Sequence, residues 1–235
     1  STLLLNYVAA LFMEQLYYGP WRDPEGMGFP GTAEVPELLR LPTLLGTRAH
    51  WGLPLAVAIH TLCLHASSGR FYDIHIVHDG MDARIIQGLN RVAAPFTQVS
   101  LSFLQLPEEF RHLFQNGNKD RYSPLAYARL MAGSLFPQYG RIVYLDADVL
   151  LAGDVAELYF SDLRGASVAA AGDGLALWSI EKGTMHPHLE YMGNYLSSPL
   201  SYCNSGVLVL DLDQMRRRNL EHRLLQQLRN RPEPF

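Results

Sequence analysis

The chain has 235 residues, of which 48% are hydrophobic and 18% charged, which is enough to bury the core of one large domain or of a domain and a half. Its formal net charge of −4 argues against a protein that binds nucleic acid through phosphate contacts. Cys63 and Cys203, the only cysteines, lie in apolar contexts without metal-ligand spacing, which indicates a reducing compartment and no disulfide framework.

Residues 1–40 are predicted to form an extension before the main domain. The first eighteen residues are largely apolar, but Asn6, Glu14 and Gln15 make them too polar for a spanning helix, and no basic start marks a signal peptide. We expect an amphipathic helix that docks on the protein itself or on a membrane surface, followed by a Pro/Gly-rich linker over Trp21–Pro42. The expected location is cytoplasmic or peripheral on a membrane, with the Golgi lumen left open if a targeting segment is missing.

The first half of the main domain, which we assign to residues 41–235, is predicted to alternate strands and helices. Asp82 is the expected N-cap of the second helix. The predicted strands are Leu41–Thr47, Phe71–His78 and Val99–Leu104, and the helices between them are Leu53–Ala66 and Asp82–Ala94. This alternation is typical of a parallel α/β sheet with right-handed crossovers.

The second half continues the pattern less regularly. Ser123-Pro124, a capping hydroxyl before a proline, predicts the start of a helix that ends at Pro137. A strand of small residues is expected over Ala166–Ala171 and ends at Gly172-Asp173-Gly174. The remaining expectations are an irregular segment over Leu175–Leu200, a buried strand over Val207–Asp211 and an amphipathic helix over Leu212–Asn230.

The most informative stretch is Arg141–Leu151, where four large apolar or aromatic residues run straight into Asp146 and Asp148. Such a run predicts a strand buried on both faces of a parallel sheet. Because side chains alternate along a strand, the two carboxylates are expected on the same side. Paired carboxylates repel each other unless a cation lies between them, and hard oxygen ligands suit Mg²⁺ or Mn²⁺. The alternative is an Asp pair that caps a turn.

Three motifs occur in order: Tyr127-Ala-Arg129-Leu, Tyr144-Leu-Asp146-Ala-Asp148-Val-Leu and Asn204-Ser205-Gly206-Val. Together they resemble the family 8 retaining glycosyltransferases, which include bacterial lipopolysaccharide galactosyl- and glucosyltransferases and, more distantly, glycogenin. The similarity spans about Leu41–Leu228. It implies a GT-A fold, a Rossmann-like sandwich with a mostly parallel sheet flanked by helices. It also implies a nucleotide-sugar donor, expected to be a UDP-sugar, a saccharide or glycoconjugate acceptor, Mn²⁺ (or Mg²⁺), and hexose transfer with retention.

The resemblance also implies residue roles. Asp146 and Asp148 match the metal carboxylates, and Ala147 gives a backbone contact near the ribose. Arg129 matches the arginine that faces the donor, and its fixed fork suits a diphosphate. The catalytic candidates are Asn204, whose counterpart touches the donor sugar, and Asp173, placed near the sugar hydroxyls; Tyr127 and Ser205 join the donor-binding set. The structural alternatives are a surface charge for Arg129 and turns at Asp173 and at Asn204–Gly206.

After the first strand the chain departs from the family pattern Ala-x-Asp-x-Asn-Tyr, in which Asp and Asn read uracil. Here Arg48 and His50 stand in their places, within Gly46-Thr47-Arg48-Ala-His50-Trp51, so the same base contacts cannot form. The segment (Gly46, Thr47, Arg48, His50 and Trp51) is still assigned to donor binding, with Trp51 expected to stack on the base. The third metal ligand of the family, a His before a Gly-x-x-Lys-Pro-Trp loop, is expected to be lacking because it lies beyond the last residue of this sequence.

Two other functions fit parts of the pattern. A phosphatase of the haloacid dehalogenase type also places D-x-D after an apolar strand, but it needs a later catalytic lysine, and only Lys119 and Lys182 are present. A non-catalytic binding or scaffold domain is favoured by Arg48, His50 and the lacking ligand. No nucleic-acid partner is expected, and the sequence does not indicate an oligomeric state.

Overall fold

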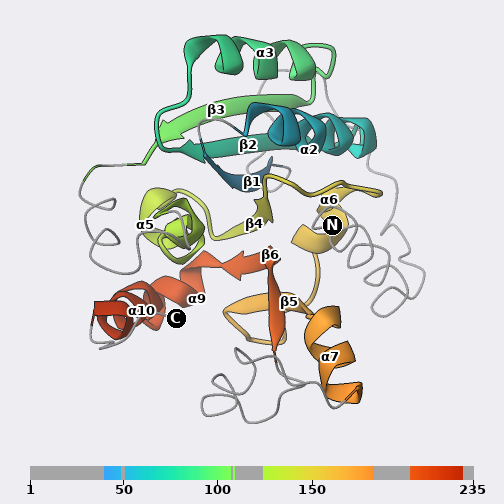
Figure 1. Cartoon of the computed structure of the whole chain (residues 1–235). Helices are drawn as coiled ribbons and strands as arrows, with labels where there is room; N and C mark the ends of the chain where they lie inside the picture. Colours follow the sequence, from blue (N-terminus) through green and yellow to red (C-terminus); the bar gives the residue numbers. More distant parts are fainter. Residues whose placement is uncertain (1–39, 49–50, 107, 109–123, 183–201, 230–235) are drawn as a thin grey trace.

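The structure, a computed structural model, describes residues 40–48, 51–106, 108, 124–182 and 202–229 (Figure 1). The predicted leading helix, nearly all of the linker and His50 lie outside these residues. Within the described ranges, no helix combines the length and the apolar character that crossing a membrane requires. Cys63 is buried and Cys203 exposed, and both are free.

A six-stranded sheet with the order β3-β2-β1-β4-β6-β5 lies at the centre of the molecule (Figure 1). Strands β1 to β4 pair in parallel, whereas β6 runs antiparallel between β4 and β5. The prediction of a mostly parallel sheet is therefore confirmed. The strands are β1 Arg40–Thr47, β2 Phe71–His78, β3 Val99–Gln105, β4 Arg141–Asp146, β5 Val168–Gly172 and β6 Cys203–Asp211.

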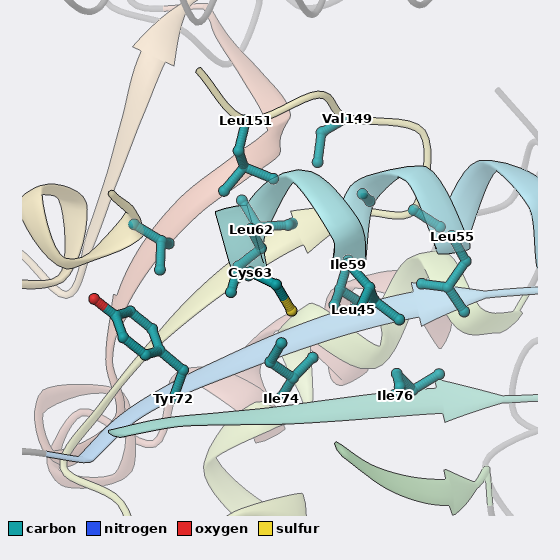
Figure 2. Packing of buried hydrophobic residues seen from close by; sticks show 14 of the residues in the cluster. Leu45, Leu55, Ile59, Leu62, Cys63, Tyr72, Ile74, Ile76, Val149 and Leu151 are labelled. Carbon is teal, nitrogen blue, oxygen red and sulfur yellow. The ribbon is translucent and has the colours of Figure 1, made fainter. Parts of the chain in front are cut away.

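Helices cover both faces of the sheet. On one face, α2 (Gly52–His65), α3 (Ala83–Ala93) and α6 (Val155–Tyr159) enclose a core that Figure 2 shows between α2 and the strands. On the other face lie the 3₁₀ helix η2 (Pro124–Leu130), α5 (Ala132–Leu135) and α9 (Leu212–Arg217). Asp82 caps α3 as predicted, since its side chain accepts a hydrogen bond from the Arg84 amide.

Strand β4 contributes to both cores because its side chains alternate. Val143 and Leu145 pack toward α2, whereas Ile142 and Tyr144 pack toward η2 and α9, and all four are at most 1% exposed. Burial on both faces is what the uninterrupted apolar run predicted. It also fixes the direction in which the residues at the end of β4 point.

Three predictions of secondary structure were wrong. The helix expected up to Pro137 is split into η2 and α5, where the Arg129 side chain turns back to donate to the Ala126 carbonyl at 2.7 Å. The segment expected to be irregular begins with a helix, α7 (Gly174–Glu181), because Asp173 accepts a hydrogen bond from the Leu175 amide and caps it.

The third error concerns the last helix. Instead of one helix over Leu212–Asn230 there are α9 and α10 (Leu220–Arg229), separated at Asn219. Asn219 has a φ of 52°, in the left-handed region that ends a helix and that asparagine tolerates better than most residues.

Candidate functional site

The ends of β1, β4 and β5 and the start of β6 meet at one edge of the sheet. Gly46 at the end of β1 is in register with Asp146 at the end of β4. Because β6 is antiparallel to β4, it begins at this edge with Cys203 and Asn204. Residues far apart in the chain thus come together where ligands of open α/β sheets commonly bind.

Arg129, from η2, lies at the centre of this edge. Its Nη2 donates to Asp146 Oδ1 at 3.1 Å, and its Nη1 donates to the Ser205 carbonyl. Its guanidinium carbon lies 4.3 Å from the centre of the Tyr144 ring. The guanidinium therefore joins η2, β4 and β6, and it lies beside the acidic motif rather than on an unrelated surface.

Asp146 is held through one oxygen of its carboxylate. Oδ1 accepts hydrogen bonds from Arg129 and, at 2.7 Å, from the Tyr144 hydroxyl. Oδ2 faces Gly206, where the Cβ atom of any larger residue would lie only 2.8 Å from it and 3.1 Å from Asn204 Oδ1. The Asn204 oxygen in turn accepts a hydrogen bond from the Gly206 amide at 2.8 Å. Glycine is needed at position 206 because two oxygen atoms approach its backbone.

Gly206→Ala is expected to lower the free energy of unfolding by about 1–3 kcal/mol, because the new methyl group meets oxygens that hydrogen bonds hold in place. Gly153→Ala is the matched control, since no atom lies within 4 Å of a Cβ at that position. Urea denaturation of both variants measures the difference. Equal stability of the two variants would show that the close approach at Gly206 has no energetic consequence.

Asp148 follows β4 in a turn, so the strand ends before the alternation can place it as expected. It is half-buried, and burial raises the pKa of its carboxyl above the usual value, with the nearby charge of Asp146 as the second cause. Ala147, between the two aspartates, is 3% exposed and packs into the core on the α2 side. Because the charge of Asp146 contributes to the raised pKa of Asp148, the two carboxylates are close enough to repel each other.

This donor set fits a hard divalent cation only in part. No group of three or more His, Cys, Asp or Glu side chains that could hold a metal occurs in the described part of the chain. Two carboxylates suit Mg²⁺ or Mn²⁺ when phosphate oxygens and water supply the remaining ligands. A binding mode that includes a phosphate-bearing substrate is what these residues can support.

The segment expected to contact the nucleotide lies between β1 and α2, and the structure describes it up to Arg48 and again from Trp51. Thr47 is 3% exposed, and the Arg48 carbonyl accepts hydrogen bonds from the Thr47 hydroxyl and the Trp51 amide. Arg48 is exposed, and Trp51 is 36% exposed at the start of α2. A Cβ at Gly46 would lie 3.4 Å from the Tyr144 hydroxyl, so this segment adjoins the Arg129–Asp146 pair.

Asp173 lies at the same edge but also serves a local role. Its amide donates to the Tyr202 carbonyl at 3.1 Å, and the preceding Gly172 pairs with Cys203, the neighbour of Asn204. Its carboxylate caps α7, so its local role is that of a helix cap, whereas the structural alternative was a turn. Two residues of the expected donor-binding set remain. Tyr127 is half-buried on η2, and Ser205 is exposed on β6.

Sequence reasoning missed the part that Tyr144 plays. Its position within an apolar run suggested a core residue, and it is indeed only 1% exposed. The spacing in the sequence could have indicated this contact. Residues two apart on a strand point to the same side, and Asp146 is two residues after Tyr144. Burial raises the pKa of Tyr144 well above its usual value, so its hydroxyl is a hydrogen-bond donor at neutral pH.

The chain is similar in sequence to known proteins. The sequence pattern of glycosyl transferase family 8 matches residues 42–234. The chain is 26% identical over 171 residues to "Probable galacturonosyltransferase-like 7" of Arabidopsis thaliana, a match that covers 68% of this chain and 44% of that protein. The chain thus spans less than half the length of this relative.

Solved structures share the fold. The bifunctional glycosyltransferase WbbM superposes with a TM-score of 0.69 at 22% identity, over 84% of this chain and 36% of WbbM. The galactosyltransferase LgtC, solved with donor and acceptor sugar analogs, superposes with a TM-score of 0.62 at 17% identity, over 81% of this chain and 66% of LgtC. These likenesses confirm the expected GT-A fold.

Proposed function

The chain belongs to glycosyl transferase family 8, and from this premise we propose that it is, or forms the core of, a metal-dependent glycosyltransferase. The donor is a nucleotide-sugar, with UDP as the expected nucleotide, and the acceptor is a saccharide. The observation that carries the proposal is the cluster of Arg129, Asp146 and Asp148 at the edge of the sheet, held by Tyr144.

Arg129 is proposed to bind the diphosphate of the donor. Its guanidinium is fixed by two backbone carbonyls and by the Tyr144 ring, so little conformational entropy is lost when an anion binds. Asp146 and Asp148 would hold Mn²⁺ or Mg²⁺ beside it. When bound, this ion offsets the negative charge that develops on the diphosphate as it leaves.

The nucleotide is proposed to lie over the residues that end β1 and precede α2, Gly46 to Arg48 and Trp51. The partly exposed Trp51 ring offers a stacking surface that accepts any base, whereas Arg48 cannot make the contacts of an Asp to uracil. Gly46, Thr47 and the Ala147 backbone would line the ribose side. Discrimination among UDP, GDP and CDP is therefore proposed to be loose.

The sugar is proposed to contact Asn204 and Asp173, with Tyr127 and Ser205 completing the donor site. The side chain of Asn204 is an amide, which is a poor nucleophile, and its oxygen accepts a hydrogen bond from Gly206. The Asp173 carboxylate accepts a hydrogen bond from the Leu175 amide at the start of α7. Neither side chain is therefore well suited to attack the anomeric carbon. We favour departure of the diphosphate and attack by the acceptor on the same face of the sugar, which retains the configuration.

A second candidate is a binding or scaffold domain without turnover. It is favoured by the Arg129–Asp146 ion pair, which neutralises one carboxylate without a metal, and by the lack of a third ligand in the described ranges. The phosphatase interpretation is set aside because β1, β2 and β3 precede Asp146 and the family is that of glycosyltransferases.

Release of UDP from UDP-glucose, UDP-galactose and UDP-galacturonate, with Mn²⁺ or with EDTA, separates the two candidates. The last donor is included because of the name of the plant relative. The assay is run on this chain and on any longer natural form. Mn²⁺-dependent release from at least one donor is expected, and nucleotide binding without any release by either form would favour the scaffold domain.

A further inference from the structure

We infer that Tyr144 is a positioning residue that assigns the two oxygens of Asp146 to different partners, Oδ1 to Arg129 and Oδ2 to the metal ion. The inference rests on the proposed function, because it concerns how the chain prepares Asp146 for a cation. It adds a residue that does not itself touch the donor or the metal.

The hydroxyl of Tyr144 fixes the orientation of the carboxylate. It donates to Asp146 Oδ1 at 2.7 Å, and Arg129 donates to the same oxygen at 3.1 Å. Two donors occupy the lone pairs of Oδ1, which leaves Oδ2, on the Gly206 side, as the oxygen to offer to a cation. The terminal torsion of an aspartate is otherwise broad, so without the hydroxyl the carboxylate would rotate more freely.

The ring of Tyr144 acts on a different partner. The guanidinium carbon of Arg129 lies 4.3 Å from the ring centre, within the range of a cation–π interaction. The ring therefore supports Arg129, which is proposed to bind the diphosphate, while the hydroxyl supports Asp146. Because the two supports come from different atoms of one side chain, they are separable by substitution.

Burial on β4 makes this arrangement rigid. Tyr144 is 1% exposed and packs among residues of η2, β6 and α9. On the β1 side, the hydroxyl lies next to Gly46, where a Cβ would make an ordinary contact with it at 3.4 Å. Tyr144 thus lies between the segment proposed for the nucleotide and the carboxylate proposed for the metal.

The test compares Tyr144→Phe, which keeps the ring and removes the hydroxyl, with Tyr144→Leu, which removes both. Tyr72→Phe is the matched control, because Tyr72 is 0% exposed and its hydroxyl donates to the Asp154 carboxylate at 2.8 Å, with its side chain in the core on the other face of the sheet. Mn²⁺ affinity in the presence of UDP is measured by electron paramagnetic resonance. UDP affinity without metal is measured by calorimetry, and folding by thermal denaturation.

Tyr144→Phe is expected to weaken Mn²⁺ binding about 10–100-fold, the usual effect of losing a side chain that orients a metal ligand. Its UDP affinity without metal should stay close to wild type, and excess Mn²⁺ should restore turnover. Tyr144→Leu should lose both affinities, whereas Tyr72→Phe should keep both even if its melting temperature falls.

Wild-type Mn²⁺ affinity in Tyr144→Phe would overturn the positioning role, and so would an equal loss of Mn²⁺ and UDP affinity in this variant. If the wild-type chain bound neither Mn²⁺ nor UDP, the proposed function would fail and the positioning role with it. Failure of the proposed function is distinguishable from failure of the positioning role alone, because it is seen with the wild-type chain before any variant is made.

Discussion

Asp148→Asn is expected to abolish Mn²⁺-dependent binding of the nucleotide-sugar and at the same time to stabilise the metal-free protein. The loss of one of the two proposed carboxylate ligands should weaken Mn²⁺ binding by about 100-fold or more. This effect is larger than the one expected for a residue that only orients a metal ligand. The gain in stability follows from the environment of Asp148, because burial and the charge of Asp146 raise the pKa of its carboxyl.

The coupling between protonation of Asp148 and folding determines that the substitution stabilises the metal-free protein. With a raised folded pKa, the folded protein binds the Asp148 proton more readily than the unfolded chain does, so ionisation costs stability as pH rises above the ordinary value of 3.8. Asparagine removes that cost at neutral pH. Calorimetric unfolding at pH 7 with EDTA should therefore give a higher melting temperature for Asp148→Asn than for wild type.

Asp162→Asn serves as the control, because Asp162 is exposed and its side chain accepts a hydrogen bond from the Arg164 amide, as an asparagine can. It should bind Mn²⁺ and UDP like the wild type. Unchanged Mn²⁺ binding in Asp148→Asn would show that the metal lies elsewhere.

Arg129→Lys is expected to reduce kcat/KM for the donor by about 10²–10³-fold, which is typical when a preorganised donor to a developing negative charge is lost. Lysine keeps the charge but not the planar fork, so it cannot contact Asp146 and the carbonyls of Ala126 and Ser205 together. UDP affinity should fall both with and without Mn²⁺. The free energy of unfolding should fall by about 1–3 kcal/mol as hydrogen bonds to a charged group are lost.

Arg141→Lys separates stability from function. Arg141 lies at the other end of β4, and its Nη1 donates to the carbonyls of Tyr159 and Ser161, so this guanidinium also holds backbone groups. This variant should lose stability without losing affinity for UDP. If Arg129→Lys kept wild-type UDP affinity while losing only stability, Arg129 would be a structural residue.

The sequence predicted the structure best where an apolar pattern is compatible with only one kind of element. The apolar run before Asp146 requires burial on both faces, and β4 is buried in this way. The apolar alternation earlier in the chain likewise predicted β1 to β3 and the two helices between them. Placing Arg129 beside Asp146 required the family resemblance, because neither periodicity nor spacing joins η2 to the end of β4.

The errors arose where a local contact overrides periodicity. The amphipathic pattern of the last helix continues through Asn219, so only its left-handed backbone conformation reveals the break. The cap that Asp173 gives to α7 was anticipated as a turn but not as the start of a helix. Tyr144 was assigned to the core alone because a buried side chain and a site residue look the same in an apolar run.

The most direct test of the account is whether one Mn²⁺ ion touches both the acidic motif and the diphosphate. Electron paramagnetic resonance of Mn²⁺ with UDP carrying isotopically labelled phosphate oxygens detects this, because the label broadens the signal only when those oxygens bind the ion. The wild-type chain should give a protein-bound signal that the label broadens, and Asp146→Asn/Asp148→Asn should leave only the spectrum of free Mn²⁺–UDP. A protein-bound, label-broadened signal that persists in the double variant would contradict the account.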